Sequence, residues 1–201
     1  PAKGFAVSLT ISMDTVVVRE KLTKLSKVVP PSVVLRVIGF RLMSWVDESF
    51  KTRGRGKWAP LAWSTLALRQ RGGDQPLQDT GRYKQSFVTE TDQNTYVEVG
   101  TSLKTASGLV LAKIHEEGTK PYTIRVRNAK VLAAQAGTGA GGAGQHGVLG
   151  AIGSKRSSGW LFFGKEVHHP GIPPRPVLPT KDEAEKLVVQ TVDGMLGEAV
   201  K

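Results

Sequence analysis

Glycine dominates one stretch of this sequence and limits what can form there. Between Gly137 and Gly153, eight of 17 residues are glycine, and glycine loses more backbone freedom on ordering than any other residue. Regular structure is therefore costly in this stretch. We expect a flexible Gly-rich insertion over residues 128–160, with the fold built from the segments on either side of it.

The N-terminal quarter of the chain has the hydrophobic pattern of one strand and two helices. Apolar residues alternate over 5–12, as in a half-buried strand. A short basic helix over about 14–28 should end at Pro30, because a proline ring cannot continue the helical hydrogen bonds. Apolar residues then recur at helical spacing over 32–51, which predicts the main amphipathic helix, and Gly54 is expected to stop it.

A long loop follows this helix. Segment 52–80 mixes glycine, proline and basic residues with two tryptophans, and we interpret it as an ordered, basic, Trp-containing loop. Ser64 is expected to cap a short helix inside the loop. Thr80, with the preceding aspartate, is expected to cap a turn of helix over 82–87.

Several strands are predicted by the alternation of apolar and polar residues. These runs are 88–91 and 96–100, which suit a β-hairpin, then 122–127, 160–163 and 166–168. In the run 122–127 the register places Ile124 and Val126 inward. A short helix that ends at Gly118 separates this run from the hairpin.

Together these elements indicate a single α+β domain over residues 1–201. We expect a mostly antiparallel sheet with the long N-terminal-half helix and a C-terminal helix on one face, together with long loops and a Gly-rich arm. The C-terminal helix, within 180–201, is predicted over 181–199 because Thr180 and Glu183 suit a capping box ahead of an apolar stripe.

Positive charge is in excess and unevenly spread. The chain has 28 lysines and arginines against 17 aspartates and glutamates, a formal net charge of +11. Between Arg36 and Arg71 lie eight basic residues and only two acidic ones, and such an excess attracts polyanions. The candidate DNA-facing side chains are Lys51, Arg53, Arg55, Lys57, Arg69 and Arg71.

Two interpretations of this basic segment remain open. It is either a solvated face that aids solubility or docks on an acidic protein, or a surface that contacts nucleic acid. Trp58 and Trp63 suit stacking on bases, although packing in a core or an interface is the commoner use of tryptophan. No RNP, zinc-finger or helix-turn-helix signature decides between the two.

Nothing in the sequence resembles a catalytic or metal-binding motif. Cysteine is absent, no two of the four histidines have the i, i+4 spacing of a helical metal site, and there is neither a Gly-x-Ser-x-Gly nor a Walker motif. A metal site that joins His115 and Glu116 to His168 or His169 would require the fold to bring them together. We therefore predict a non-enzymatic protein with no cofactor, and with no membrane span because no apolar run approaches about 18 residues.

Three segments, taken together, resemble one known family. The first runs from Trp58-Ala59-Pro60-Leu61 to Asp79-Thr80-Gly81-Arg82-Tyr83 with Ser86, and the second is Ala112-Lys113-Ile114-His115-Glu116-Glu117-Gly118. The third is Val167-His168-His169-Pro170-Gly171-Ile172-Pro173-Pro174-Arg175-Pro176-Val177-Leu178. Their residues and order are similar to those of the virion morphogenesis, or tail-completion (neck), family of tailed bacteriophages, which includes the phage Mu G protein. Tyr83 and Val177 depart from the Leu and Phe that are usual in that family.

The resemblance implies a structural protein of the virion, at the head–tail junction, which passes through the host cytoplasm during assembly. It implies a homo-oligomeric ring that joins the DNA-filled capsid to the tail, with portal or adaptor proteins and a tail terminator or tail tube as partners and with nonspecific contact to packaged DNA. The candidate interface residues are Trp58, Trp63, Arg82, His169, Pro170, Arg175 and Pro176. The alternative function is a basic module that binds nucleic acid nonspecifically.

Overall fold

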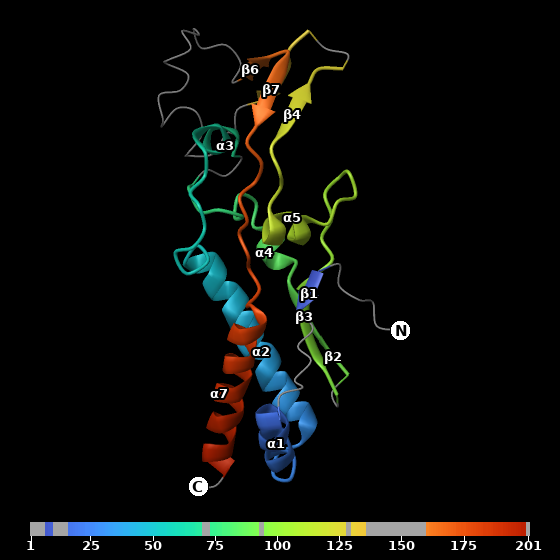
Figure 1. Ribbon diagram of the computed structural model, residues 1–201, viewed down its shortest axis with the longest axis vertical. Helices are drawn as coiled ribbons and strands as arrows, with labels where there is room; N and C mark the ends of the chain where they lie inside the picture. The colour runs from blue at the N-terminus through green and yellow to red at the C-terminus, as the bar shows by residue number, and fades with distance from the viewer. Residues whose placement is uncertain are drawn as a thin grey trace.

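The chain forms an elongated molecule with helices at one end and narrow β-ribbons at the other (Figure 1). This computed structural model describes residues 7–9, 16–69, 73–92, 95–127, 130–135 and 160–199. The three longer helices, α1 (Val16–Leu25), α2 (Pro31–Lys51) and α7 (Lys181–Ala199), lie together at the helical end. No helix within the described residues combines the length and the apolarity needed to cross a bilayer.

Helix α2 is the main helix predicted from the sequence. It starts with Pro31 in its first turn, where the missing N–H has no helical partner to lose. Its inward face repeats at four-residue spacing through Ile38, Leu42, Val46 and Phe50, each at most 1% exposed. The predicted amphipathic helix over 32–51 is thus confirmed.

Helix α7 packs against α2 and α1 and confirms the predicted C-terminal helix. Its buried stripe is Ala184, Val188 and Val192. The capping box is present: the backbone N–H of Thr180 donates to Oε2 of Glu183 at 3.0 Å, and the N–H of Glu183 donates to Oγ1 of Thr180 at 3.3 Å. The two reciprocal bonds satisfy donors that a helix start otherwise leaves without a partner.

A three-stranded antiparallel sheet lies against α2. Its order is β1 (Val7–Leu9), β3 (Val97–Thr101), β2 (Val88–Thr91), so the predicted hairpin is formed by β2 and β3. The approach is close at Gly39 of α2, where an added Cβ would lie 2.9 Å from Cγ2 of Thr89. A glycine at this position lets the helix backbone approach the sheet.

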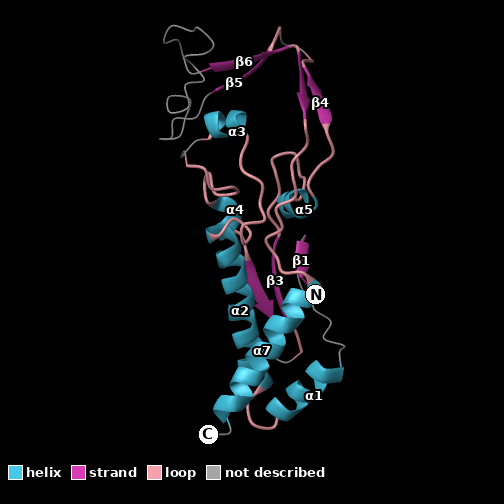
Figure 2. Cartoon of the chain, turned by 60° about the vertical axis from the view of Figure 1, so that its left-hand side comes forward, coloured by secondary structure: helices cyan, strands magenta, loops and turns pink. Residues whose placement is uncertain are grey.

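The single sheet expected from the sequence is divided into three. Within the described residues every pairing is antiparallel, and there β4 (Tyr122–Arg125) pairs only with β7 (Glu166–His169), and β5 (Leu132–Gln135) only with β6 (Trp160–Gly164). These two ribbons project from the body at the end opposite the helices (Figure 2).

The predicted register of the strand at 122–127 was wrong in its burial. Ile124 is 38% exposed and all four residues of β4 are exposed, while Val126 is half-buried. Alternation in the sequence indicates a strand, but burial needs a second layer, and a two-stranded ribbon away from the body has none. Strand β5 lies inside the segment predicted as a flexible insertion, whose residues 128–129 and 136–159 fall outside the described part.

Short helices connect the two ends, and one of their caps differs from the prediction. Helix α3 (Trp63–Leu68) has Ala62 at its N-cap instead of Ser64, and it ends before Arg69. Helix α4 (Arg82–Gln85) has Gly81, at φ +75°, as its N-cap, and the predicted capping residue Thr80 accepts with its hydroxyl from the N–H of Arg82 at 3.4 Å. Helix α5 (Leu111–Glu117) ends at Gly118, as predicted, with φ +74°.

The core extends from the α2/α7 contact to an aromatic cluster at the C-terminal end of α2. There the ring of Phe50 packs edge-on against Trp58, Tyr83 and Phe87, at centroid distances of 5.9, 5.8 and 6.0 Å. All four side chains are at most 5% exposed. Burial of four large rings at one place anchors the first part of the 52–80 loop to the body.

Candidate functional site

The three sequence segments that carry the resemblance meet at one place in the fold. We call this place the motif junction and define it as residues Trp58–Pro60, His115–Thr119 and Gly171–Leu178. It lies between the helical end and the ribbons, where α5 and the extended chain after β7 pass each other (Figure 1). The hydrogen bonds described below link the third segment to each of the other two.

Arg175 is the central side chain of the motif junction. It is 6% exposed, and its guanidinium donates to the carbonyl of Ala59 from Nη2 at 3.0 Å and from Nε at 3.3 Å, and to the carbonyl of Pro60 at 3.3 Å. Its backbone N–H donates to the carbonyl of His115 at 2.6 Å. The rigid fork of arginine suits such convergent carbonyls, and burial lowers the pKa of Arg175.

Trp58 ties the first segment to the third. Its indole N–H donates to the carbonyl of Pro176 at 2.9 Å, and its side chain is 5% exposed. The next carbonyl, that of Val177, accepts from the hydroxyl of Ser49 in α2 at 3.0 Å. The extended chain at 176–177 is thereby fixed to the aromatic cluster on one side and to α2 on the other.

The turn between α2 and Trp58 uses an unusual backbone conformation. Four consecutive residues, Arg53 to Gly56, have positive φ, with values of 54°, 64°, 57° and 77°. Non-glycine residues rarely adopt this region. A Cβ on Gly54 would overlap the Trp58 ring, with Cε2 at 2.7 Å. Glycine is therefore needed at this position for the Trp58 ring to pack against Phe50 at the end of α2.

Glu116 joins the second segment to the third. Its Oε1 accepts from the backbone N–H of Val177 at 2.8 Å and from that of Leu178 at 3.3 Å. Burial raises the pKa of Glu116, and these two hydrogen bonds oppose the rise because they favour the carboxylate. The carboxylate thus accepts the backbone hydrogen bonds of Val177 and Leu178 that the carbonyls of a neighbouring strand would accept in a sheet.

Two glycines allow the second and third segments to cross closely. Gly118 has φ +74°, and a Cβ there would lie 2.6 Å from the carbonyl oxygen of Ile172. Gly171 has φ +90°, and its Cβ would overlap the carbonyl oxygen of Thr119. The crossing is closed by two hydrogen bonds of 2.9 Å, from the N–H of Thr119 to the carbonyl of Ile172 and from the N–H of Ile172 to the Thr119 hydroxyl.

The half-buried His115 and the buried Tyr83 face each other with polar side-chain atoms that make no hydrogen bond among the described residues. Their rings are 5.2 Å apart, and neither Nδ1 of His115 nor the hydroxyl of Tyr83 has a hydrogen-bond partner among the described residues. Burial, with a smaller effect of Arg175, lowers the pKa of His115 to about 4. Burial raises the pKa of Tyr83. The imidazole is therefore neutral at physiological pH.

The other candidate interface residues lie around the motif junction or away from it. His169 is half-buried, stacks on Tyr122 at 4.7 Å, and accepts from the N–H of Gly171 at 3.0 Å. Pro170 and Pro176 are exposed. Trp63 is 56% exposed on α3, and Arg82 is exposed on α4. Of the seven candidates, the side chains of Trp58, Arg175 and His169 make contacts within their own chain.

The basic residues of the 51–71 segment mostly have partners inside the chain. Arg53 pairs with Asp74 at 2.6 Å, and Lys57 with Glu183 at 3.4 Å. Arg69, predicted to face DNA, is 5% exposed, lies 3.9 Å from Asp79 and donates to the carbonyl of Gln75. Lys51 is exposed at the end of α2, and Arg71 lies outside the described residues.

Arg55 is held by a contact that the sequence patterns do not predict. Its guanidinium lies 3.4 Å from the centroid of the Trp45 ring and donates to Oγ of Ser49 at 2.9 Å. Trp45 and Arg55 are ten positions apart across the helix end, and no spacing rule for a single helix pairs them. Only the left-handed turn after α2 brings them together. Glu116 was considered from the sequence as a metal ligand, and its hydrogen bonds to the backbone N–H groups of Val177 and Leu178 were not predicted.

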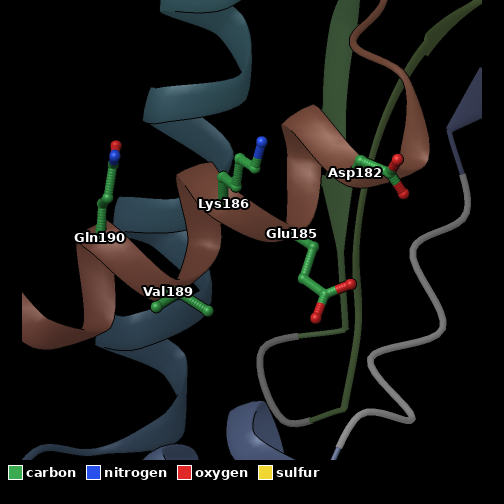
Figure 3. Close-up of a pocket in the computed structure, with 5 residues that line it drawn as sticks. All are labelled: Asp182, Glu185, Lys186, Val189 and Gln190. Atoms are coloured by element: carbon green, nitrogen blue, oxygen red, sulfur yellow. The ribbon is translucent and has the colours of Figure 1, made fainter.

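Two surface cavities are lined by described residues. One, of about 480 Å³, lies along α7 (Figure 3). Its described lining is Asp182, Glu185, Lys186, Val189 and Gln190, all from one helix, with Lys186 and Gln190 pointing to one side and Glu185 and Val189 to the other. This lining includes no histidine or hydroxyl nucleophile.

A second cavity, of about 440 Å³, lies between α2 and α7. Its lining includes Arg41, Glu48 and Arg55, together with the Trp45 ring on which Arg55 stacks. In the part of the chain that the structure describes, no group of three or more His, Asp or Glu side chains is placed to hold a metal ion. The metal site that joins His115 and Glu116 to His168 or His169 is thus not formed by these residues.

In comparisons with known proteins, no family model, no curated protein and no solved structure matches this chain.

Proposed function

We propose that this chain is a structural neck, or tail-completion, protein of a tailed bacteriophage, which assembles as a ring of identical copies where the capsid joins the tail. The observation that carries the proposal is the motif junction. Three short segments resemble one family, and they lie up to about 120 positions apart in the chain. Chance resemblances would have no reason to meet, yet here the third segment hydrogen-bonds to both of the others.

The chemistry of the junction supports a structural role. Its polar side chains are directed at backbone groups: Arg175 at two carbonyls, Trp58 at one, and Glu116 at two N–H groups. Such contacts fix the path of the chain and leave these groups no part in acid–base chemistry. The junction thus joins the ribbons firmly to the helical end.

The two ribbons support assembly with neighbouring copies. A two-stranded ribbon is marginally stable alone in water, and apolar side chains of these ribbons are exposed, among them Tyr122 at 47%, Ile124 at 38% and Phe162 at 68%. A neighbouring copy that covers them would supply the missing layer. Contact between the ribbon end of one copy and another face of the next is heterologous, and such contacts can close into rings.

The test is the mass of the assembly by light scattering, with particle shape by negative-stain electron microscopy. The purified protein is measured alone and mixed with the neighbouring structural proteins of its genome. We expect a discrete ring in at least one of these samples. A monomer in all of them, at every concentration tried, would contradict the proposal.

Matched variants sharpen this test. Ile124→Glu and Phe162→Glu place charge on the ribbons, and Val28→Glu and Phe40→Glu place it on exposed apolar positions of the helical end, 61% and 67% exposed. We expect the first pair to abolish the ring and the second pair to retain it. Loss of the ring in both pairs of variants, or in neither pair, would contradict the assignment of the ribbons to the interface.

A further inference from the structure

A second segment with an excess of positive charge includes strands of the two ribbons. From Gly118 to Lys165 the sequence has seven basic residues and no acidic one. Helices α1, α2 and α7, by contrast, carry eight basic and eight acidic side chains. We define the ribbon head as the described residues of 120–135 and 160–169.

The cations of the ribbon head are accessible. Lys120, Arg125, Arg127, Lys130 and Lys165 are all exposed. Glu166 is the acidic residue of this region, and it lies 3.0 Å from Nε of Arg125 and 3.4 Å from Nε2 of His168. The remaining four cations have no carboxylate of the ribbon head to neutralise them.

Three of these cations lie close to the end of the β4/β7 ribbon. Arg125 is the last residue of β4, and Arg127 follows it two positions further, at a bend of the chain. Lys165 lies across the ribbon from Val126, the residue between these two arginines, because its carbonyl accepts from the N–H of Val126 at 3.1 Å. Three cations therefore gather at one end of the β4/β7 ribbon.

The basic loop at 51–71, in contrast, is a poor polyanion surface. Arg53, Lys57 and Arg69 each face a carboxylate of the same chain, and Arg69 is buried. A phosphate group would have to compete with these partners.

We infer that the ribbon head binds the phosphate backbone of duplex DNA without reading its sequence. This surface offers almost a single sign of charge, with Glu166 as its acidic residue, and the uniformly negative phosphate backbone of DNA is complementary to it. A two-stranded ribbon also fits the major groove of B-DNA in width. Thr123 and Arg125 are exposed on the face of β4 opposite Tyr122 and Ile124, so they stay exposed when a neighbouring copy covers those two apolar residues. This inference does not depend on ring assembly, and it places the DNA contact on the ribbons instead of the loop predicted from the sequence.

The experiment measures binding to a fluorescent duplex of random sequence by anisotropy, at salt concentrations from about 50 to about 200 mM. The variant carries Lys120→Gln, Arg127→Gln, Lys130→Gln and Lys165→Gln. The control removes the same charge from exposed positions of the helical end, with Lys24→Gln, Lys27→Gln, Arg36→Gln and Arg41→Gln.

We expect the ribbon-head variant to bind at least about tenfold more weakly at the low-salt end, with a salt slope smaller by about 3–4 because up to four phosphate contacts are lost. The control should change affinity less than about threefold. Equal losses in both variants would show a general effect of net charge and overturn the inference, as would wild-type binding by the ribbon-head variant.

Two further measurements distinguish DNA binding from attraction to an acidic protein and from ring assembly. Polyglutamate is added as a competitor at the same concentration of charge. Displacement as effective as that by unlabelled DNA would indicate an acidic protein partner and overturn the inference. Light scattering on the same variants measures the mass of the assembly. If the ribbon-head variant loses DNA binding but keeps the wild-type mass, the loss comes from the removed cations and does not bear on the proposed ring.

Discussion

The indole N–H of Trp58 donates a 2.9 Å hydrogen bond to the carbonyl of Pro176, 118 positions further along the chain. Through this bond the loop after α2 and the chain that returns from the ribbons are joined at the edge of the aromatic cluster. The closure of so long a segment by a buried contact costs chain entropy. The contact must therefore be supported by its neighbours, Arg175 and Glu116.

Replacement of Trp58 tests this contact. Trp58→Ala should lower the free energy of unfolding by about 3–5 kcal/mol, because a buried ring is lost. Trp58→Phe should cost about 1–2 kcal/mol, mostly for the lost hydrogen bond. Chemical denaturation measures both, with Trp63→Ala, at an exposed position, as the control expected below about 1 kcal/mol. Similar losses at the two tryptophans would show that the contact is not a core one.

The crossing of the chain at Gly118 gives a second prediction. Gly118→Ala should destabilise the protein by about 2–4 kcal/mol, since it adds backbone strain at φ +74° and a Cβ that overlaps the Ile172 carbonyl. Gly108→Ala is the matched control: its φ is +82°, but a Cβ there meets nothing within 4 Å. The control should cost only about 1 kcal/mol, and an equal effect at both positions would refute the close crossing.

The stability of the fold should fall in mild acid because of His115. The pKa of His115 is about 4 in the folded state, below the ordinary 6.5. Above pH 6.5 the imidazole is neutral in both the folded and the unfolded state, and the fold has its full stability. As the pH falls from 6.5 towards 4, the unfolded chain binds the proton more readily than the folded one, so the stability decreases. We expect a loss of up to about 2 kcal/mol over this window, reduced from the full shift because the ring is partly exposed.

Urea unfolding at neutral pH and near pH 5 measures the effect. His115→Gln should flatten the pH dependence, while His168→Gln, at an exposed position, should leave it unchanged. The titration of Glu116 changes stability in the opposite direction. Because its pKa is raised in the folded state, the folded chain binds the Glu116 proton more readily than the unfolded chain, and this contribution to stability is lost as the pH rises. A wild-type slope in His115→Gln would assign the acid sensitivity to other groups.

The capping box at the start of α7 gives a fourth prediction. Thr180→Ala removes the hydroxyl that accepts from the N–H of Glu183, and it should lower stability by about 1 kcal/mol. Thr180→Ser keeps the hydroxyl and should cost much less. Thermal unfolding followed by circular dichroism compares the two, and an equal shift of the melting temperature in both would show that the cap is not used.

The helices of this fold could be predicted from the sequence because their signals are local. Periodic apolar residues, Pro31 and the Thr180–Glu183 box set α2 and α7 with little help from the rest of the chain. The exposure of Ile124 could not be predicted, because alternation in a strand does not reveal whether a second layer covers it. The number of sheets could not be predicted either, because the same strands in the same order can pair into one sheet or into three.

The motif junction was predicted only as a set of residues, without its geometry. Positive charge in the sequence suggested that Arg69 faces a ligand, but burial beside Asp79 depends on a turn that no local rule predicts. The stack of Arg55 on Trp45 likewise requires four residues with positive φ. Long-range contacts of this kind follow from the path of the chain, and a single sequence does not determine that path by inspection.

The uneven distribution of charge along this molecule makes it an electric dipole. Helix α7, at the helical end, carries five acidic and two basic side chains, and the cations of the ribbon head lie at the far end of the long axis (Figure 1). Near a polyanion the cationic ribbon head is attracted, whereas α1, α2 and α7 together carry as many acidic as basic side chains and feel little net force. The molecule therefore turns before it touches. The electrostatic attraction extends over about 10 Å at 0.1 M salt, and added salt shortens this distance. Within it, the molecule is oriented before it makes contact.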